Sequence, residues 1–218
     1  MNQTDGERKG LSRRTFLKAG LTGGLLVAVG GRWLPLSQAL AQAQAEYALI
    51  IDLNKCVGCR ACELACQQRN GLPEGKSFIH ILPKGEGEDR WFLPVQCQHC
   101  RDAPCEHVCP TRATYHHESG VVLINDKTCV GCKYCAVACP YNARTFNEET
   151  GIVDKCWLCL DWVLGGGQPA CVQACVLGAR TFGRRDDPEI AALLQRAKPL
   201  HPEFGTEPGV LHYIFPGD

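Results

Sequence analysis

The chain has 218 residues, with 23 basic and 23 acidic side chains and therefore no formal net charge. A hydrophobic content of 45% excludes a wholly disordered chain, and the length allows one large domain or two small ones. Sixteen cysteines, far above ordinary usage, allow eight disulfides, four structural zinc sites, free buried thiols or four iron–sulfur clusters. The spacing of the cysteines has to decide among these.

The first 45 residues are typical of an export signal. Arg13 and Arg14 precede an uncharged apolar stretch, residues 19–31, which is too short to span a bilayer. Small-residue cleavage signatures follow at 39–41 and 43–45. These features predict a signal peptide, and the paired arginines resemble the twin-arginine export signal. We therefore exclude residues 1–45 from the fold and expect a periplasmic protein.

Removal of a signal that ends at Ala41 changes the charge balance. It takes away six basic and two acidic residues and leaves 17 basic and 21 acidic ones. This acidic surplus argues against a nucleic-acid-binding protein, which usually shows a basic surplus. No later apolar run is long enough for a transmembrane helix, so membrane contact is expected to come through a partner. Because the twin-arginine route carries folded proteins, a cofactor inserted in the reducing cytoplasm is compatible with export.

From residue 46 onward, short strands and helices are expected. An apolar segment leads directly into the first cysteine motif, and two pairs of later segments, each joined by a turn that contains glycine, predict hairpins. The expected strands are 47–52, 114–116, 121–124, 144–146 and 152–154, and the expected helices are 59–68 and 132–138. The fold class is therefore α+β.

The cysteines fall into four motifs of four, and none is left over. The motifs are Cys56-x2-Cys59-x2-Cys62-x3-Cys66, Cys97-x2-Cys100-x4-Cys105-x3-Cys109, Cys129-x2-Cys132-x2-Cys135-x3-Cys139 and Cys156-x2-Cys159-x11-Cys171-x3-Cys175. The first and third match the spacing of bacterial ferredoxins. Three thiolates at this spacing reach one cubane only if the backbone curls around it, so Gly58 and Gly131 are expected at positive φ or in close approach. The fourth cysteine of such a run ligates the other cluster.

Other chemistries fit this pattern less well. Structural zinc sites usually use two separated C-x2-C pairs, and cysteines three residues apart make a poor disulfide framework. The sequence has no C-x-x-C-H haem motif, no P-loop and no G-x-G-x-x-G fingerprint. His116 and His117 fall in a predicted hairpin turn and are expected to be solvated rather than to act as ligands. The sequence thus predicts a non-catalytic electron carrier, with a structural zinc protein as the alternative.

The chain also repeats itself. Residues 51–59 recur as 124–132, and residues 139–146 recur as 175–182. This repetition predicts two ferredoxin-like lobes, each with two [4Fe-4S] clusters, over residues 46–183 with an insertion at 67–96. Four basic residues beside motif cysteines either raise the potentials of bound clusters or are solvated. These residues are Arg60, Lys133, Arg144 and Arg180.

The order of the motifs, the leader and the segment Cys139-Pro140-Tyr141-Asn142-Ala143-Arg144 resemble the iron–sulfur subunit of dimethyl-sulfoxide-reductase-type complexes. Similar subunits occur in tetrathionate, polysulfide and cytochrome-linked nitrite reductase systems. In that family the first motif pairs with the fourth and the second with the third. The resemblance implies four ligand sets: Cys56, Cys59, Cys62 and Cys175; Cys66, Cys156, Cys159 and Cys171; Cys97, Cys100, Cys105 and Cys139; Cys109, Cys129, Cys132 and Cys135. With all sixteen present, four [4Fe-4S] clusters are expected.

The resemblance further implies a function in anaerobic respiration. The chain would relay single electrons between a polytopic, quinol-interacting membrane subunit and a larger molybdopterin-type catalytic subunit, peripheral to the inner membrane. A free soluble periplasmic polyferredoxin is the alternative. The segment 71–94, with Trp91 and Phe92, and the C-terminal tail 184–218 lie outside the motifs. We expect them to dock with partners or to pack over the lobes.

Overall fold

The computed structural model describes residues 26–29, 32–35 and 46–217, with side chains described for 46–217. Most of the predicted signal, residues 1–45, therefore lies outside the described residues. The described part of it pairs two antiparallel strands, β1 (Leu26–Val29) and β2 (Arg32–Pro35). No helix among the described residues is long and apolar enough to cross a bilayer.

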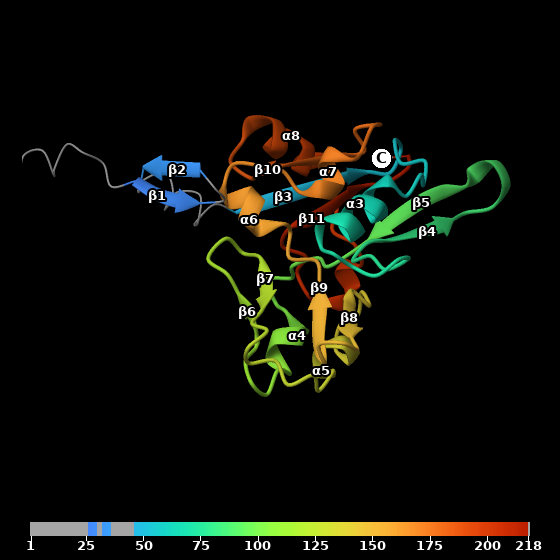
Figure 1. The fold of residues 1–218 in the computed structure, drawn as a ribbon. Helices are drawn as coiled ribbons and strands as arrows, with labels where there is room; N and C mark the ends of the chain where they lie inside the picture. The colour runs from blue at the N-terminus through green and yellow to red at the C-terminus, as the bar shows by residue number, and fades with distance from the viewer. Residues whose placement is uncertain (1–25, 30–31, 36–45, 218) are drawn as a thin grey trace, which may run out of the picture.

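A three-stranded sheet forms the centre of the molecule (Figure 1). Its middle strand is β3 (Tyr47–Asp52), with β10 (Arg180–Arg184) antiparallel on one side and β11 (Leu211–Ile214) parallel on the other. The first five residues of β3 are buried, because this apolar run packs into the core on both faces of the sheet. The strand predicted at 47–52 is therefore confirmed.

Two hairpins lie below this sheet in Figure 1. The paired strands are β6 (Thr114–His116) with β7 (Val122–Ile124), and β8 (Arg144–Asn147) with β9 (Ile152–Lys155). Both predicted hairpins are confirmed to within one residue at each end. We call residues 46–66 and 156–217 the sheet half and residues 97–155 the hairpin half.

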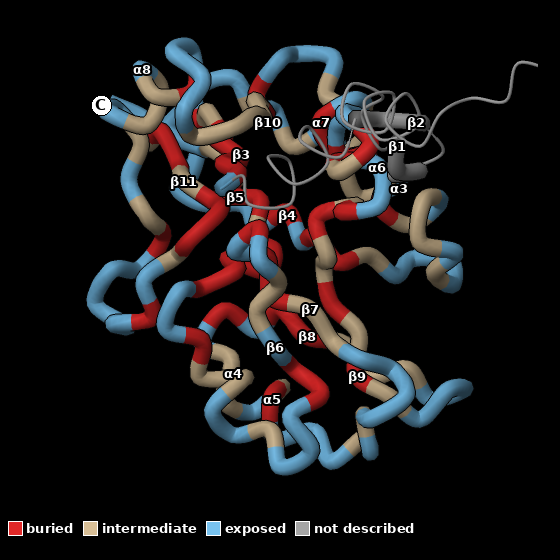
Figure 2. Tube along the Cα trace, turned by 90° about the vertical axis from the view of Figure 1, so that its left-hand side faces the viewer, coloured by how far each residue is buried: buried red, intermediate tan, exposed pale blue. Residues whose placement is uncertain are grey.

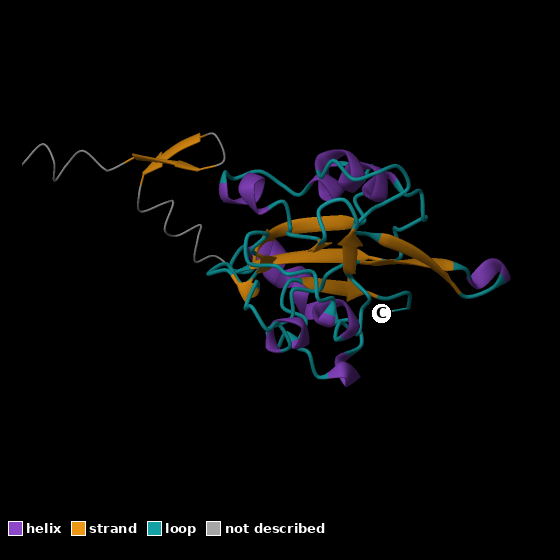
Figure 3. Ribbon diagram, turned by 60° about the horizontal axis from the view of Figure 1, so that its bottom comes forward, coloured by secondary structure: helices purple, strands orange, loops and turns teal. Residues whose placement is uncertain are grey.

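Short helices surround the strands, and loops make up much of the chain (Figure 3). The helices are α3 (Ala61–Arg69), α4 (Pro104–His107), α5 (Tyr134–Val137), α6 (Leu160–Leu164), α7 (Ala170–Gln173) and α8 (Pro188–Arg196), with 3-10 turns η1 (Gly87–Asp89) and η2 (Pro202–Phe204). The helices predicted from 59 and 132 each begin two residues later. The reason is that Arg60 and Lys133 have a left-handed φ of 63° and cannot join a right-handed helix.

The segments outside the motifs pack against the core. The insertion forms the hairpin β4 (His80–Lys84) and β5 (Trp91–Val95), and the Trp91 ring meets Phe215 edge to face at 6.3 Å between ring centroids. The tail supplies β11, in which Tyr213 is fully buried. Figure 2 shows the buried segments concentrated along these strands and where the halves meet. The docking role of the tail stays a prediction.

Candidate functional site

The structure brings the sixteen cysteines together in four sets of four, which we number first to fourth. The first, second and fourth sets each line one cavity, and in the third set Cys100 has the other three thiols as electrostatic neighbours. The sets, from first to fourth, are Cys56, Cys59, Cys62 and Cys175; Cys66, Cys156, Cys159 and Cys171; Cys97, Cys100, Cys105 and Cys139; Cys109, Cys129, Cys132 and Cys135. They are the groupings that the family resemblance implies.

Each set takes cysteines from two motifs because a helical turn separates neighbouring sets. On α3, Cys62 lines the first cavity, whereas Cys66, about 6 Å further along the helix axis, lines the second. On and just after α7, Cys171 lines the second cavity and Cys175 lines the first. Because α3 packs against α7, the two motifs close around both cavities.

The chemistry of these donor sets fits [4Fe-4S] clusters. All sixteen cysteines lie among the described residues as free thiols. In the part of the chain that is described, no three Cys, His, Asp or Glu side chains stand close enough to hold a single metal ion. Burial raises the pKa of Cys66 to about 11 and that of Cys100 to about 12. Cationic iron would deprotonate such thiols, and four thiolates around one space are what a cubane requires.

Two equivalent Val-Gly turns let the backbone curl around the first and fourth sets. Gly58 has a φ of 71° and Gly131 a φ of 66°, as the motif spacing predicts. A side chain at Gly131 would place its Cβ 2.1 Å from the carbonyl oxygen of Gly151, and one at Gly58 would lie 2.5 Å from the ring of Phe92. Both turns therefore need glycine for conformation and for space.

Gly131→Ala is expected to destabilise the protein by about 3 kcal/mol, combining the left-handed penalty with overpacking against main chain that cannot easily move. Gly120→Ala is the matched control, because Gly120 has a φ of 78° but has nothing within 4 Å of the place that an added Cβ would take. Thermal unfolding should show a much larger fall in Tm for the first variant, together with iron loss. Equal Tm values for the two variants would contradict the packing role of Gly131.

Two buried arginines occupy equivalent places in the repeat. Arg180 is 5% exposed, and its Nη1 donates to Gln96 Oε1 at 2.9 Å and lies 3.7 Å from Cys171 Sγ. Arg144 is 7% exposed, and its Nη1 donates to Thr114 Oγ1 at 3.2 Å. Burial by itself would lower the pKa of each guanidinium, but neighbouring thiolates outweigh burial and raise it.

Each arginine also has an Nη2 that is buried without a hydrogen-bond partner. Such orphaned donors are rare, and these lie among the cysteine sets. They fit the hydrogen bonds that stabilise anionic clusters. By contrast, Arg60 is exposed and pairs with Glu63 at 3.7 Å, and exposed Lys133 stacks over Phe146 at 3.6 Å. The expected tuning role therefore suits Arg144 and Arg180, whereas the other two are surface residues.

Sequence reasoning missed three buried residues where the halves meet. Lys155 is 4% exposed, and its Nζ donates to the carbonyl oxygens of Val122 and, at 2.8 Å, of Cys156. Gln96 points its Nε2 at Cys156 Sγ, 3.7 Å away. His99 is fully buried, with Nδ1 accepting from the Val122 N–H at 3.1 Å and Nε2 unpartnered. The sequence signal that could have found Lys155 is its place directly before a motif cysteine.

These residues act on the thiol of Cys97 in the third set. Burial opposes its charged form, but Lys155 and His99 outweigh burial and lower the pKa of Cys97 to about 5. Lys155 and His99 thus place positive potential at the Cys97 sulfur.

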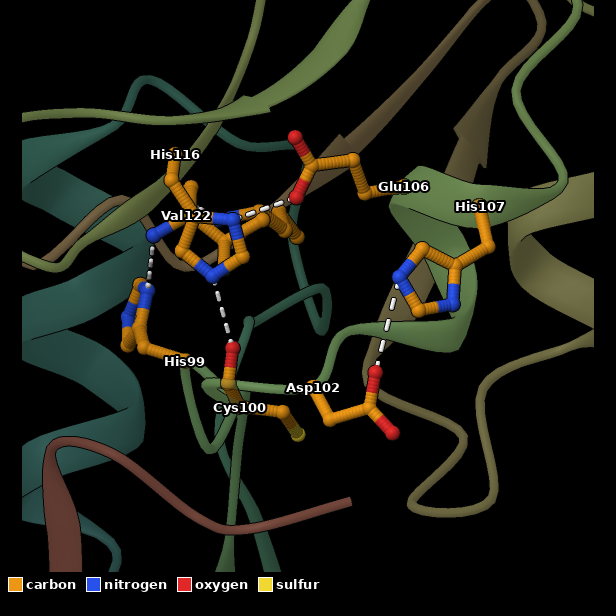
Figure 4. Close-up of polar contacts among 8 residues, drawn as sticks. His99, Cys100, Asp102, Glu106, His107, His116 and Val122 are labelled. Atoms are coloured by element: carbon orange, nitrogen blue, oxygen red, sulfur yellow. Dashed lines mark hydrogen bonds and ion pairs between the residues drawn. The ribbon is translucent and has the colours of Figure 1, made fainter.

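His116 contacts the main chain of the third set at Cys100 (Figure 4). The ring of His116 bonds through Nε2 to the carbonyl oxygen of Cys100 at 2.8 Å and through Nδ1 to the carboxylate of Glu106. Nearby, His107 lies 3.5 Å from Asp102. His116 is the last residue of β6, which packs against α4, so its ring is about 31% exposed and hydrogen-bonded rather than fully solvated.

The first and fourth sets reach the surface. Among the cysteines, Cys59 and Cys132 are the exposed ones, and they occupy equivalent positions in the repeat. Exposed apolar side chains lie near these sets: Val57, Val176 and Leu177 line the first cavity, Val130 lines the fourth, and Tyr134 and Val137 lie on α5, which carries Cys135 of the fourth set. Clustered exposed apolar residues mark interaction sites, so both ends of the arrangement are suited to contact a partner.

Comparison with known proteins agrees with this geometry. The family model of a 4Fe-4S dicluster domain matches residues 89–185, and that of a 4Fe-4S binding domain matches residues 49–69. A tetrathionate reductase subunit of Salmonella typhimurium is 39% identical, over 92% of this chain and 87% of the relative. Protein NrfC of Escherichia coli is 43% identical, over 94% and 96% of the two chains. The chain belongs to this family of iron–sulfur subunits.

A third relative carries a functional name. Thiosulfate reductase electron transfer subunit PhsB of Salmonella typhi is 42% identical, over 66% of this chain and 79% of the relative. In the present chain, the segments that match the two 4Fe-4S families together cover all four cysteine motifs. All sixteen cysteines thus lie inside ferredoxin-type domains.

Proposed function

We propose that this iron–sulfur subunit relays single electrons through four [4Fe-4S] clusters. The observation that carries the proposal is the gathering of sixteen thiols into four complete sets. When bound, each cluster supplies a one-electron redox centre. The names of the relatives, a tetrathionate reductase subunit and a thiosulfate reductase electron transfer subunit, support a place in a reductase complex.

The contacts between sets support a linear relay with two ferredoxin-like lobes. Arg180 faces cysteines of the first and second sets, and Arg144 faces cysteines of the third and fourth. The second and third sets meet where Cys97 lies in electrostatic contact with Cys156. Each lobe would therefore hold two clusters, and the chain of contacts runs from the first set to the fourth.

The exposed ends of this line are the proposed entry and exit points. Cys59 at one end and Cys132 at the other lie within apolar surfaces, whereas Cys66, Cys97 and Cys171 in the middle are buried. We assign one end to a quinone-linked membrane subunit and the other to a larger molybdopterin-type catalytic subunit. We further propose that residues 1–45 are a twin-arginine signal and that the protein is periplasmic, held at the inner membrane by its partners.

Affinity purification of the full chain from its native membranes under anaerobic conditions tests this assignment. The expected result is elution with a large molybdopterin-containing subunit and a polytopic subunit, with cubane-type EPR signals after reduction. Elution of the chain alone with the same signals would favour a free polyferredoxin. Zinc in place of iron would reject the relay altogether.

A further inference from the structure

Lys155 lies where the two halves of the molecule meet. It is the last residue of β9 and stands directly before Cys156 of the second set. Its Nζ is fixed by the carbonyl oxygen of Cys156 at 2.8 Å and by that of Val122 on β7. Cys97 of the third set is its strongest attractive neighbour. The ammonium group is therefore held in one position, near a cysteine of the second set and a cysteine of the third set.

The surroundings of Lys155 show what compensates its charge. A buried ammonium is costly unless it is both hydrogen-bonded and paired with negative charge. The two carbonyl oxygens supply the hydrogen bonds, but they carry no formal negative charge. The charged groups that act on Lys155 include Cys97, Cys105 and Cys156, which attract it, and Arg144 and the ring of His99, which repel it. Burial lowers the pKa of Lys155, and thiolates of the second and third sets oppose that shift, so anionic sulfur of both sets is the counter-charge that favours the ammonium form.

Lys155 and the two buried arginines are distributed along the line of cysteine sets. Arg180 faces the first and second sets, Lys155 the second and third, and Arg144 the third and fourth. One buried cation therefore lies at each of the three junctions along the line of four sets. The arginines belong to the internal repeat, but Lys155 has no counterpart in it, because the junction between the halves occurs once.

We propose that Lys155 is a positioning residue for the electron step between the two halves. It holds a fixed positive charge between the second and third sets and so favours an added electron on either side of the junction, with no bond made or broken. This inference rests on the proposed relay. At the same junction Gln96 adds a donor, because its Nε2 points at Cys156 Sγ, and the ring of His99 accepts a hydrogen bond from the Val122 N–H.

Potentiometric EPR titration of the intact complex tests this role with Lys155→Met, which removes the charge at similar length, and Lys155→Arg, which keeps it. In Lys155→Met the reduced-to-oxidised ratio of the second and third clusters at a fixed applied potential should fall about tenfold. The first and fourth clusters should shift much less, and Lys155→Arg should behave like the parent protein. Lys84→Met is the matched control, because Lys84 is exposed at the end of β4 and should shift none of the potentials.

Unchanged second and third potentials in a fully loaded Lys155→Met protein overturn the inference, as does an equal shift of all four. Should the Met variant lose iron, Lys155→Gln replaces it, since the amide can still donate to the carbonyls. Loss of iron in both neutral variants with retention in Lys155→Arg supports the charge role, whereas loss in all three shows a packing role and overturns it. A parent protein without four clusters would instead reject the proposed relay.

Discussion

Cys175→Ser is expected to remove or convert the cluster of the first set and to leave that of the second set intact. Cys175 is only four residues from Cys171, yet the two thiols line different cavities. A single lost ligand should cost about four iron atoms per chain or convert the cluster to a three-iron form. Iron analysis and EPR of the reduced and oxidised protein measure both changes.

Cysteine variants of the same set should affect the same cluster. Cys175→Ser and Cys56→Ser should lose the same EPR component, although the two cysteines are more than a hundred residues apart in the chain. The single variants Cys171→Ser and Cys66→Ser should both lose the same second EPR component, different from the first. If Cys175→Ser instead matched Cys156→Ser, the ligands would group by motif rather than by cavity, and the crossed pairing would be wrong.

Arg180→Met is expected to lower the potentials of the first and second clusters by on the order of 100 mV. A unit charge at about 6 Å, in a medium of effective dielectric about 20, contributes about 3 kcal/mol to holding an added electron. Arg180 is buried, with Nη1 3.7 Å from Cys171 Sγ, so solvent screens it little. The loss of its bond to Gln96 Oε1 adds a modest destabilisation.

Arg144→Met provides the internal control for this prediction. Because Arg144 faces the third and fourth sets, its replacement should lower those two potentials and spare the first and second. Arg180→Lys should recover part of the loss, since lysine keeps the charge without the planar fork. Redox titration followed by EPR resolves the four components. A uniform shift of all four clusters by either arginine variant would show a global effect and contradict a local charge role.

Local signals in the sequence were enough for much of this molecule. Strand β3, both hairpins, and the left-handed turns at Gly58 and Gly131 follow from short-range patterns and cysteine spacing. The helix starts were misplaced by two residues, because the left-handed conformation at Arg60 and Lys133 has no sequence marker as clear as glycine. The grouping of cysteines required the family resemblance, since spacing alone does not say which motifs meet.

Contacts between distant segments account for what was missed. Lys155 lies at the junction because β7 and the segment around Cys97 pack against it. The hydropathy of β9 gives no sign of these long-range contacts. The tail likewise becomes a core strand through parallel pairing of β11 with β3 across most of the described chain. Such long-range pairings depend on the whole fold. The tail has no cysteine motif, so its local sequence does not indicate that Tyr213 lies in the core.

The metal content of the protein tests the central claim, that four sets of cysteines hold four cubanes, most directly. We predict that anaerobically purified protein contains about sixteen iron and about sixteen acid-labile sulfide per chain, and that a reductive EPR titration resolves four one-electron components. Stoichiometric zinc, or iron near twelve or fewer per chain in fully folded protein, would contradict it.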